Sequence, residues 1–342
     1  MASLWQRIGT FIGAHLMVIV PADVVVGVLF PQTLLPIKPL IPTFFAIMTF
    51  QNSLSNDLAA MRVAVRRPWP IVITLLVVHL LMPLVVFGIA SLIFGAGSAT
   101  VAGVVLEYTV PIGASTIMWI GMFSGELALG LATLLVSTPV SPFTIPLTLK
   151  ALVGATVQID TLGMMGNMAY MVAIPALLAT VLNEVSHGWA QRTLAPATTP
   201  LSRLLLPIIV ATNATGIAEP LRHLTPRLVG IMALMLDLAV GSFLVGMALA
   251  RMLSKGNEGR FVAISFSCGV RNVTAGAVLA AQYFGPEVMF PAIIATPFQQ
   301  VLAALFGNVM QRILAGRKPR SSSVVDDMSR TQAVDVRPEQ SP

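Results

Sequence analysis

Charged residues are scarce in this chain of 342 residues, because Lys, Arg, Asp and Glu together make up only 10% of it. Cysteine is scarcer still: there is one, which excludes an internal disulfide. The four histidines and the cysteine lack the spacing of a zinc site. The sequence also has no Ser/His/Asp or nucleotide-binding pattern, so we expect neither an enzyme nor a bound cofactor.

Long apolar runs are abundant instead. The sequence is 56% hydrophobic with a mean hydropathy of +0.86, and several runs exceed the roughly 20 residues that cross a bilayer. This composition predicts an all-α, multi-pass protein of the cell membrane, surrounded by lipid. The high pI of about 10.1 does not indicate a nucleic-acid partner, because nearly all the basic residues fall in short loops or the tail.

Ten apolar segments are predicted to cross the membrane as helices. They cover residues 9–30, 35–56, 68–95, 99–123, 127–150, 163–184, 202–219, 228–250, 259–284 and 287–311. The first run lacks a convincing cleavage site, so we interpret it as a retained helix rather than a signal peptide. Residues 1–312 are predicted to form the transporter domain, whereas residues 317–342 have too little apolar content to fold and are predicted to be a disordered cytoplasmic tail.

The basic residues predict how the chain enters the membrane. With a cytoplasmic N-terminus, fifteen Lys and Arg residues lie inside, and only Lys38, Lys150, Arg222 and Arg227 lie outside. Cytoplasmic loops of membrane proteins carry the excess of basic residues. Both termini are therefore predicted to be cytoplasmic, which agrees with an even number of spans.

The ten spans resemble two copies of five. Residues 17–22 (MVIVPA) recur as residues 171–176 (MVAIPA), at an offset of 154. Further matches have offsets between 154 and 161: Asn52 with Asn213, His79 with Asp237, Gly113 with Gly269, and Thr138–Pro139 with Thr296–Pro297. An odd number of spans per copy would make residues 163–311 an inverted repeat of residues 9–150. Chance recurrence in a chain with 24 Pro and 26 Gly is the alternative.

The fourth and ninth spans contain matching interruptions. Residues 107–116 (EYTVPIGAST) place proline and glycine beside hydroxyl groups and an acid, and residues 267–276 (SCGVRNVTAG) include an arginine. In inverted-repeat transporters, broken helices of this kind cross near the midplane and line the binding site. Close packing of small residues would explain the glycines, but it would not explain Glu107 or Arg271.

Four motifs in order resemble those of the bile acid:sodium symporter family, over about residues 10–312. They are residues 66–70 (RRPWP), the break at 111–116, residues 137–142 (STPVSP) and residues 269–272 (GVRN). The resemblance implies ten helices in a panel and a core domain. It also implies that broken helices 4 and 9 cross, and that amphipathic or small carboxylates are carried by alternating access.

The chain departs from the family where sodium-coupled members hold their ions. By the resemblance, the matching positions are Ser115, Thr116, Gly130, Leu134, Ser267, Arg271 and either Val78 or His79. Only Ser115, Thr116 and Ser267 keep a side-chain oxygen, and the acid that would balance the charge of the ion is absent. Strict sodium coupling is therefore not expected, and both sodium and a proton stay open as the coupling ion.

Arg271 is the most unusual residue of these interruptions. A charge near the bilayer centre costs at least ~2.5–3.5 kcal/mol on insertion scales, so it should face a cavity and have a partner. We expect Glu107 to be that partner, with Asp237 as the second candidate. Our hypothesis is that Arg271 permanently supplies the charge that sodium supplies in relatives, and that it receives the carboxylate of a small organic anion. A purely structural pair with an acid is the alternative.

The remaining candidates are polar residues inside the predicted spans. His79 could carry a coupled proton, because histidine titrates near neutral pH, or it could be a packing residue. The amides of Asn213 and Asn272 complete the predicted substrate and ion site. Cys268 leaves an arsenite permease as a minor alternative, although the related permeases place their thiol in the first broken helix. A channel-like uniporter and a membrane sensor are the other classes considered.

Overall fold

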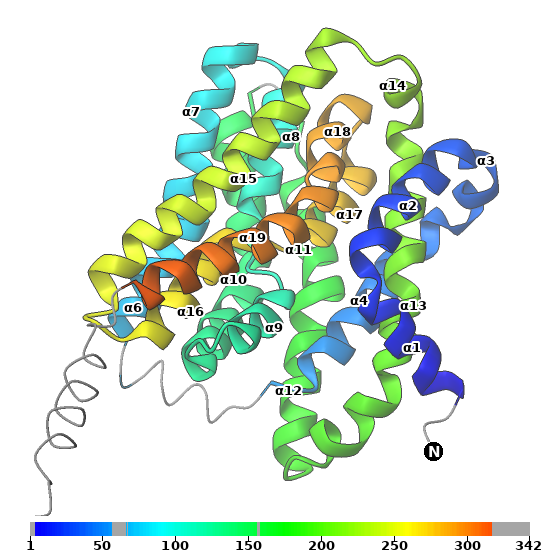
Figure 1. Ribbon diagram of the computed structural model, residues 1–342. Coiled ribbons are helices and arrows are strands. Elements are labelled where there is room, and N and C mark those ends of the chain that lie inside the picture. The colour runs from blue at the N-terminus through cyan, green and yellow to red at the C-terminus, as the bar shows by residue number, and fades with distance from the viewer. Residues whose placement is uncertain (1–3, 57–65, 67, 156–157, 317–342) are drawn as a thin grey trace, which may run out of the picture.

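The computed structural model describes residues 4–56, 66, 68–155 and 158–316, and these residues fold almost entirely as helices (Figure 1). Within those ranges there is no strand, and extended pairing is confined to one isolated two-residue bridge. The predicted tail at 317–342 lies outside the described residues. The all-α prediction is confirmed for the part of the chain that the structure describes.

Seven helical segments of the described chain are long and apolar enough to cross a membrane. They are Pro31–Ser53, Pro68–Phe94, Leu127–Val153, Thr161–Val185, Ala190–Arg222, Pro226–Leu253 and Pro286–Ala315. An eighth would form if α1 (Leu4–Ala14) and α2 (Leu16–Leu29), which are bent by 88° at their junction, are one span. The chain is therefore a multi-pass membrane protein.

The seven segments are built from continuous helices and from helices with one altered turn. Their elements are α3 (Pro31–Leu34), η1 (Leu35–Leu40) and α4 (Ile41–Ser53); α6 (Pro68–Leu76), η2 (Val77–Leu81) and α7 (Met82–Phe94); α10 (Leu127–Val153); α11 (Thr161–Met168), η3 (Ala169–Ala173) and α12 (Ile174–Val185); η4 (Ala190–Leu194), α13 (Ala195–Ala214), η5 (Thr215–Ile217) and α14 (Ala218–Arg222); α15 (Pro226–Leu253); and α18 (Pro286–Ile294) and α19 (Thr296–Ala315).

Two further apolar segments are helices interrupted in the middle. The first consists of α8 (Ala99–Thr109) and α9 (Ser115–Met122), and the second of α16 (Glu258–Gly269) and α17 (Val273–Tyr283). Both interruptions lie where proline or glycine stands beside polar residues in the sequence. The chain therefore has broken helices at the two positions that the sequence predicts.

Most predicted span boundaries lie within a few residues of the observed ones, but one is wrong. The seventh span is predicted to begin at residue 202, whereas the helical segment begins at Ala190. The intervening residues include Pro196, Pro200 and three threonines, which indicate a loop. The helix continues through them because the turn before Pro196 widens to π-helix (η4), and Pro200 lies inside α13 without ending it.

Three turns are widened to π-helix, and each lies just before a proline. The widened turns η2, η3 and η4 end two residues before Pro83, Pro175 and Pro196. A proline ring clashes with the carbonyl four residues earlier and has no N–H to bond it, so the helix locally widens. In η2 this widening affects the turn that carries His79, one of the predicted site residues.

The helices form two groups. In Figure 1, α1, α2, α4 and α13 lie together on the right, and α7, α15, α16 and α19 lie on the left. Contacts between α13 and α2, α13 and α4, and α15 and α16 are among the most extensive in the molecule. The two interrupted helices lie in the body of the protein, and every residue of α8 after Ala99 is buried.

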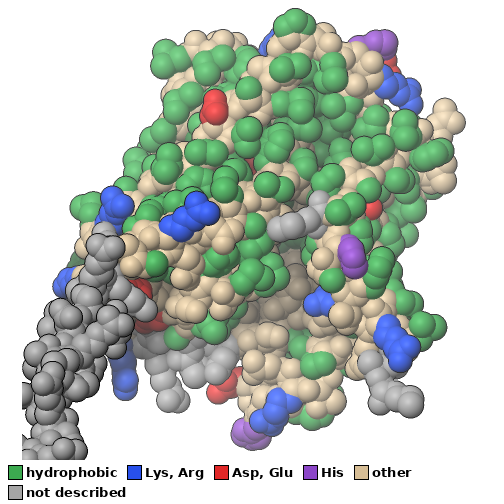
Figure 2. Space-filling model, viewed as in Figure 1, with side chains coloured by type: hydrophobic (Ala, Val, Ile, Leu, Met, Phe, Trp, Pro, Cys, Tyr) green, Lys and Arg blue, Asp and Glu red, His purple; other side chains and the backbone are tan. Residues whose placement is uncertain are grey.

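The outer surface is strongly apolar. Leu92, Leu162 and Met252 each have more than three quarters of their surface exposed. Hydrophobic side chains cover most of the face in Figure 2, and most of the visible Lys and Arg side chains lie toward its lower end. So much exposed apolar surface is expected when lipid, rather than water, surrounds the helices.

Candidate functional site

The two helix interruptions lie against each other and pair through their backbones. Ile112 and Arg271 form an antiparallel bridge. Two hydrogen bonds complete it, from Gly113 N–H to the Val270 carbonyl (3.2 Å) and from Asn272 N–H to the Pro111 carbonyl (2.8 Å). Backbone N–H and carbonyl groups without a hydrogen-bond partner are costly away from water. Each broken helix therefore supplies partners for some of the unpaired backbone groups of the other. The interruptions therefore cross at one point.

Two glycines permit this close approach. A Cβ atom on Gly113 would lie 2.7 Å from the carbonyl oxygen of Arg271, and one on Gly276 would lie 2.3 Å from Oε2 of Glu107. Both distances are shorter than van der Waals contact. Glycine is needed at Gly113 because the atom it meets belongs to the opposing backbone, whereas at Gly276 a larger residue would displace the Glu107 carboxylate.

Side chains from two further helices hold the crossing backbone from either side. Gln299 of α19 accepts a hydrogen bond from Arg271 N–H (2.9 Å) and donates one to the Arg271 carbonyl (2.7 Å). The Gln299 amide therefore pairs with both the N–H and the carbonyl of Arg271, as the backbone of a neighbouring β-strand does. In the other interruption, Ile112 N–H donates to Oγ of Ser137 on α10 (3.1 Å). Each bridged residue is thus fixed by a side chain from a later helix.

Arg271 is buried at the crossing, with 4% of its surface exposed. Its Nη1 donates to the carbonyl of Val78 (2.8 Å) and to that of Tyr108 (3.4 Å), and its guanidinium carbon lies 5.7 Å from the centre of the Tyr108 ring. Nε and Nη2 are also buried, and no hydrogen-bond partner for them lies in the described part of the chain. The guanidinium therefore has donor groups left for another acceptor.

The expected ion pair between Arg271 and an acid is not formed in this structure. Glu107 is 2% exposed, and neither of its carboxylate oxygens has a hydrogen-bond partner among the described residues. Its carboxylate lies against Gly276 rather than within ion-pair distance of the guanidinium. Asp237, the second candidate, is exposed on α15. Arg271 is instead bonded to two backbone carbonyls that lack helical partners. The carbonyl of Tyr108 is free because α8 is interrupted after it, and that of Val78 lies in the widened turn η2, five residues before Pro83, which has no N–H to bond it.

His79 belongs to the same polar network. Its Nε2 lies 2.9 Å from Oγ of Ser137, and its Nδ1 lies 3.4 Å from Oγ1 of Thr144. Because Ser137 also accepts the N–H of Ile112, a single hydroxyl joins the imidazole to the first interruption. Both ring nitrogens therefore face hydroxyl groups of α10, and the network leads from His79 to the crossing.

The three predicted hydroxyls lie at the ends of the broken helices. Thr116 is fully buried, and its Oγ1 lies 3.5 Å from the Val270 carbonyl in the opposite interruption. Ser115 is at the first residue of α9, and Ser267 is buried in the last turn of α16. The structure therefore places all three beside the crossing, and Thr116 contacts it directly.

The two predicted amides have different surroundings. Asn272 caps α17, because its Oδ1 accepts the N–H of Ala275 (3.2 Å), so it has a clear structural role. Asn213 is buried near the end of α13, and both polar atoms of its amide lack a partner among the described residues. Asn213 takes no part in the hydrogen bonds that join the two interruptions.

Sequence reasoning missed the supporting residues. Gln299, the Tyr108 ring and the hydroxyl of Ser137 all contact the crossing, yet none was predicted to do so. Gln299 could have been noticed as a polar side chain inside an apolar span, since such residues usually face the interior of a helix bundle. Tyr108 and Ser137 lie within motifs that the sequence singles out, residues 107–116 and 137–142, but nothing in those motifs shows which groups their side chains contact.

The residues that could bind a metal through side chains are few and dispersed among the described helices. The part of the chain that the structure describes has no group of three or more His, Cys, Asp or Glu residues that could hold a metal ion. Cys268 is buried at the end of α16 and is the only cysteine of the sequence. A site with several thiol ligands for a soft metal or metalloid is therefore excluded within one chain.

Comparison with known proteins identifies a family of transporters. The model of the sodium bile acid symporter family matches residues 42–222, which is more than half of the chain. The protein YbaS of Bacillus subtilis strain 168, described as uncharacterized, is 35% identical over 292 residues, which cover 85% of this chain and 95% of YbaS.

Two relatives whose names state a transport role are more distant. YocS of the same bacterium, described as an uncharacterized sodium-dependent transporter, is 24% identical over 93% of this chain and 99% of YocS. The probable sodium/metabolite cotransporter BASS1, chloroplastic, of Oryza sativa subsp. japonica is 24% identical over 81% of this chain and 67% of that protein.

Proposed function

The chain belongs to the sodium bile acid symporter family, and from that premise we propose that it carries small or amphipathic organic anions across the cell membrane by alternating access. Membership makes it a transporter rather than an enzyme. The anion class, the coupling ion and the alternating mechanism are the proposed parts, and they depend on the residues at the helix crossing.

The observation that carries the proposal is the buried Arg271 guanidinium, which has two nitrogens without a partner among the described residues. A buried cation with unused donors needs an acceptor, and a carboxylate matches the planar fork of arginine better than any neutral group does. A bound anion would also neutralise a charge that is costly inside a membrane. We therefore assign the substrate carboxylate to Arg271.

The same residue supports a proposed change in sodium coupling. The first halves of the broken helices, α8 and α16, both end at the crossing, at Thr109 and Gly269. Helix C-termini carry partial negative charge and attract a cation, which is how related transporter folds hold sodium. Arg271 places a permanent positive charge at these helix ends and donates a hydrogen bond to the Tyr108 carbonyl. We propose that it replaces a sodium ion that the names of the relatives imply for them.

The proposed architecture is ten helices in two inverted repeats. Supporting it, α8–α9 and α16–α17 occupy matching places in the two halves and pair at Ile112 and Arg271. Counting these two broken helices and the bent α1–α2 pair as spans would bring the number to ten. The excess of basic residues at the ends of the helical segments near Arg66, Arg192 and Arg260 supports an orientation with both termini in the cytoplasm.

A proton-coupled carrier of the same fold is the second candidate. It is favoured by the chain of hydrogen bonds from His79 through Ser137 to Ile112 N–H, which connects a titratable side chain with the crossing. Protonation of His79 would change which hydrogen bonds Ser137 can donate, and so would act on the backbone of the interruption.

Exchange of a labelled carboxylate in proteoliposomes tests the proposed function. The purified protein is first screened with small carboxylates and bile acids for an increase in melting temperature, and the best ligand is then used for counterflow. Arg271→Gln should lower ligand affinity by about tenfold to a hundredfold, the loss expected for hydrogen bonds to a charged group. Arg251→Gln, an exposed arginine at the end of α15, is the matched control. Unchanged binding and exchange in Arg271→Gln would overturn the assignment.

A further inference from the structure

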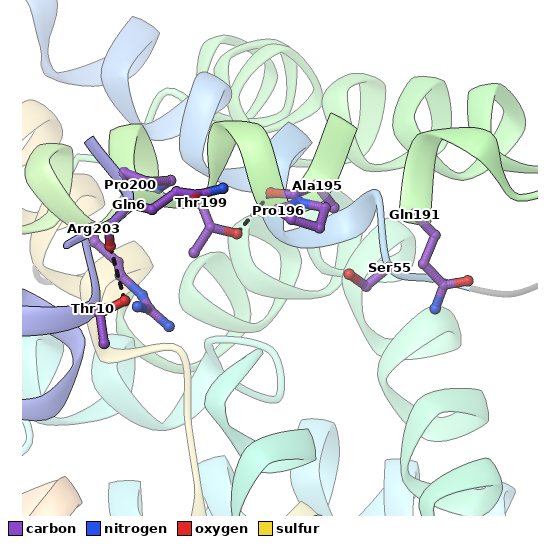
Figure 3. Close-up of a pocket in the computed structure, with 9 residues that line it drawn as sticks. All are labelled: Gln6, Thr10, Ser55, Gln191, Ala195, Pro196, Thr199, Pro200 and Arg203. Atoms are coloured by element: carbon purple, nitrogen blue, oxygen red, sulfur yellow. Dashed lines mark hydrogen bonds between the residues drawn. The ribbon is translucent and has the colours of Figure 1, made fainter. Parts of the chain in front are cut away.

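A second polar site lies away from the helix crossing, between α1 and the first turns of α13. It is an open pocket with a volume of about 480 Å³. Its lining residues are Gln6, Thr10, Ser55, Gln191, Ala195, Pro196, Thr199, Pro200 and Arg203 (Figure 3). In Figure 1 the pocket helices α1 and α13 are those on the right of the molecule, and α1 begins at its lower end.

The chemistry of the pocket suits an anion. Its lining includes one arginine together with hydroxyl and amide side chains, and no acid is among the described residues that form it. Arg203 donates through Nη1 to the carbonyl of Gly9 (2.8 Å), which fixes the guanidinium beside Thr10 as Figure 3 shows. A Cβ atom on Gly13 would lie 2.7 Å from the guanidinium carbon, so the glycine makes room for it. Arg203 is thus held in place at the pocket by α1.

The surroundings place this pocket at a membrane surface. Trp5 and Trp189, which come just before the lining residues Gln6 and Gln191, are 40% and 50% exposed. Trp5 donates through Nε1 to the Ala197 carbonyl beside the pocket (3.1 Å). Exposed tryptophan side chains gather at the headgroup level of membranes. Arg7 and Arg192, both exposed, add positive charge near the same end of the molecule.

The exposed apolar face of α1 lies opposite the pocket. Leu4, Ile8 and Phe11 are exposed and lie three or four residues apart, so they share one face of this helix. Gln6 and Thr10, which line the pocket, lie on its other face. An exposed apolar face of this kind is expected to contact lipid, so lipid surrounds the helix that carries the pocket.

We propose that this pocket binds the phosphate headgroup of an anionic phospholipid, with Arg203 as the residue that contacts the phosphate. Basic pockets between membrane helices bind such headgroups, and arginine matches phosphate through two parallel hydrogen bonds. The site does not depend on the proposed transport function.

The test measures thermal unfolding of the purified full-length protein in detergent with added short-chain lipid. Phosphatidylglycerol should raise the melting temperature of the wild type in a saturable way, and phosphatidylcholine with the same acyl chains should not. Arg203→Gln should weaken the phosphatidylglycerol effect by about tenfold or more in lipid concentration. Arg251→Gln is the control, since it removes an exposed arginine outside the pocket.

A second variant covers the case in which Arg203→Gln is unstable. Gln191→Glu has almost the same shape, and the Gln191 side chain is exposed, but the change adds a negative charge to the pocket lining. It should also weaken binding of phosphatidylglycerol. An unchanged response in Gln191→Glu, or an equal response to phosphatidylcholine, would overturn the proposal. Equal stabilisation by inorganic phosphate at the same concentration would show that the pocket binds a free anion, and would overturn the lipid assignment.

Discussion

At the scale of single residues, Arg271 is the charged side chain at the helix crossing, and its surroundings hold it in one position. The side-chain amide of Gln299 forms hydrogen bonds with both the N–H and the carbonyl of Arg271. The Arg271 guanidinium is bonded to carbonyls at the end of α8 and in η2. The residue is therefore fixed before any substrate arrives. A pre-positioned guanidinium loses little freedom when it binds a carboxylate, which favours affinity.

The glycine opposite Arg271 should be intolerant of a side chain. Gly113→Ala would place a methyl group 2.7 Å from the Arg271 carbonyl, and overpacking of this kind costs about 1–3 kcal/mol. We expect a lower melting temperature and impaired transport. Gly88→Ala in α7 is the matched control, because nothing lies within 4 Å of the position that its methyl group would take, and alanine favours a helix by about 0.5–1 kcal/mol. Equal melting temperatures for Gly113→Ala and the wild type would contradict the observed close approach.

At the scale of helices, each interruption is held by one side chain from another helix. Gln299 gives α19 two hydrogen bonds to the second interruption, whereas Ser137 gives α10 one hydrogen bond to the first. The backbone of an interruption cannot form helical hydrogen bonds, so these side chains keep it in one conformation.

Removing the Gln299 amide should loosen the second interruption. Gln299→Leu keeps the bulk of the side chain but leaves two buried backbone groups without partners, at a cost of about 1–3 kcal/mol for each unsatisfied group. Gln299→Glu should be intermediate, because a carboxylate still accepts from Arg271 N–H but cannot donate to its carbonyl. Thermal unfolding measures the melting temperatures of the wild type and both variants, which should fall in the order wild type, Gln299→Glu, Gln299→Leu. An equal decrease in melting temperature for both variants would contradict the presence of two hydrogen bonds.

The helices were more predictable than the contacts between them. Proline and glycine near Pro111 and Gly269 identify the interruptions, because their effect on the backbone is local. The start of the helix at Ala190 was missed, since prolines and threonines are typical of a loop, whereas here the widened turn before Pro196 lets the helix continue. The predicted ion pair of Arg271 with an acid is not formed either. Charge alone indicated an acid, and only the three-dimensional arrangement brings the carbonyls of Val78 and Tyr108 to the guanidinium.

At the scale of the whole molecule, the apolar outer surface and the two helix groups describe a protein that spans a membrane. The crossing joins α8–α9 with α16–α17, and α15 and α19 contact the second of these pairs. A rigid unit built around the crossing could move relative to the group of α1, α2, α4 and α13. Such movement of one helix group against another is the usual basis of alternating access.

The proposed orientation predicts which loops can be labelled from outside the cell. In a Cys268→Ala background, His223→Cys should react with a membrane-impermeant maleimide on intact cells, because His223 is exposed between α14 and α15. Glu258→Cys, exposed at the start of α16, should react only after the membrane is opened. The two variants serve as controls for each other, and the reverse pattern would place the termini outside.

The most direct test of the central claim is the rate of labelled-carboxylate exchange by wild-type proteoliposomes in sodium-containing and sodium-free medium. If Arg271 permanently supplies the charge at the crossing, the initial rate should be the same in both media, and Arg271→Gln should lose exchange in both. Exchange that requires sodium in the wild type, or that survives unchanged in Arg271→Gln, would contradict this account.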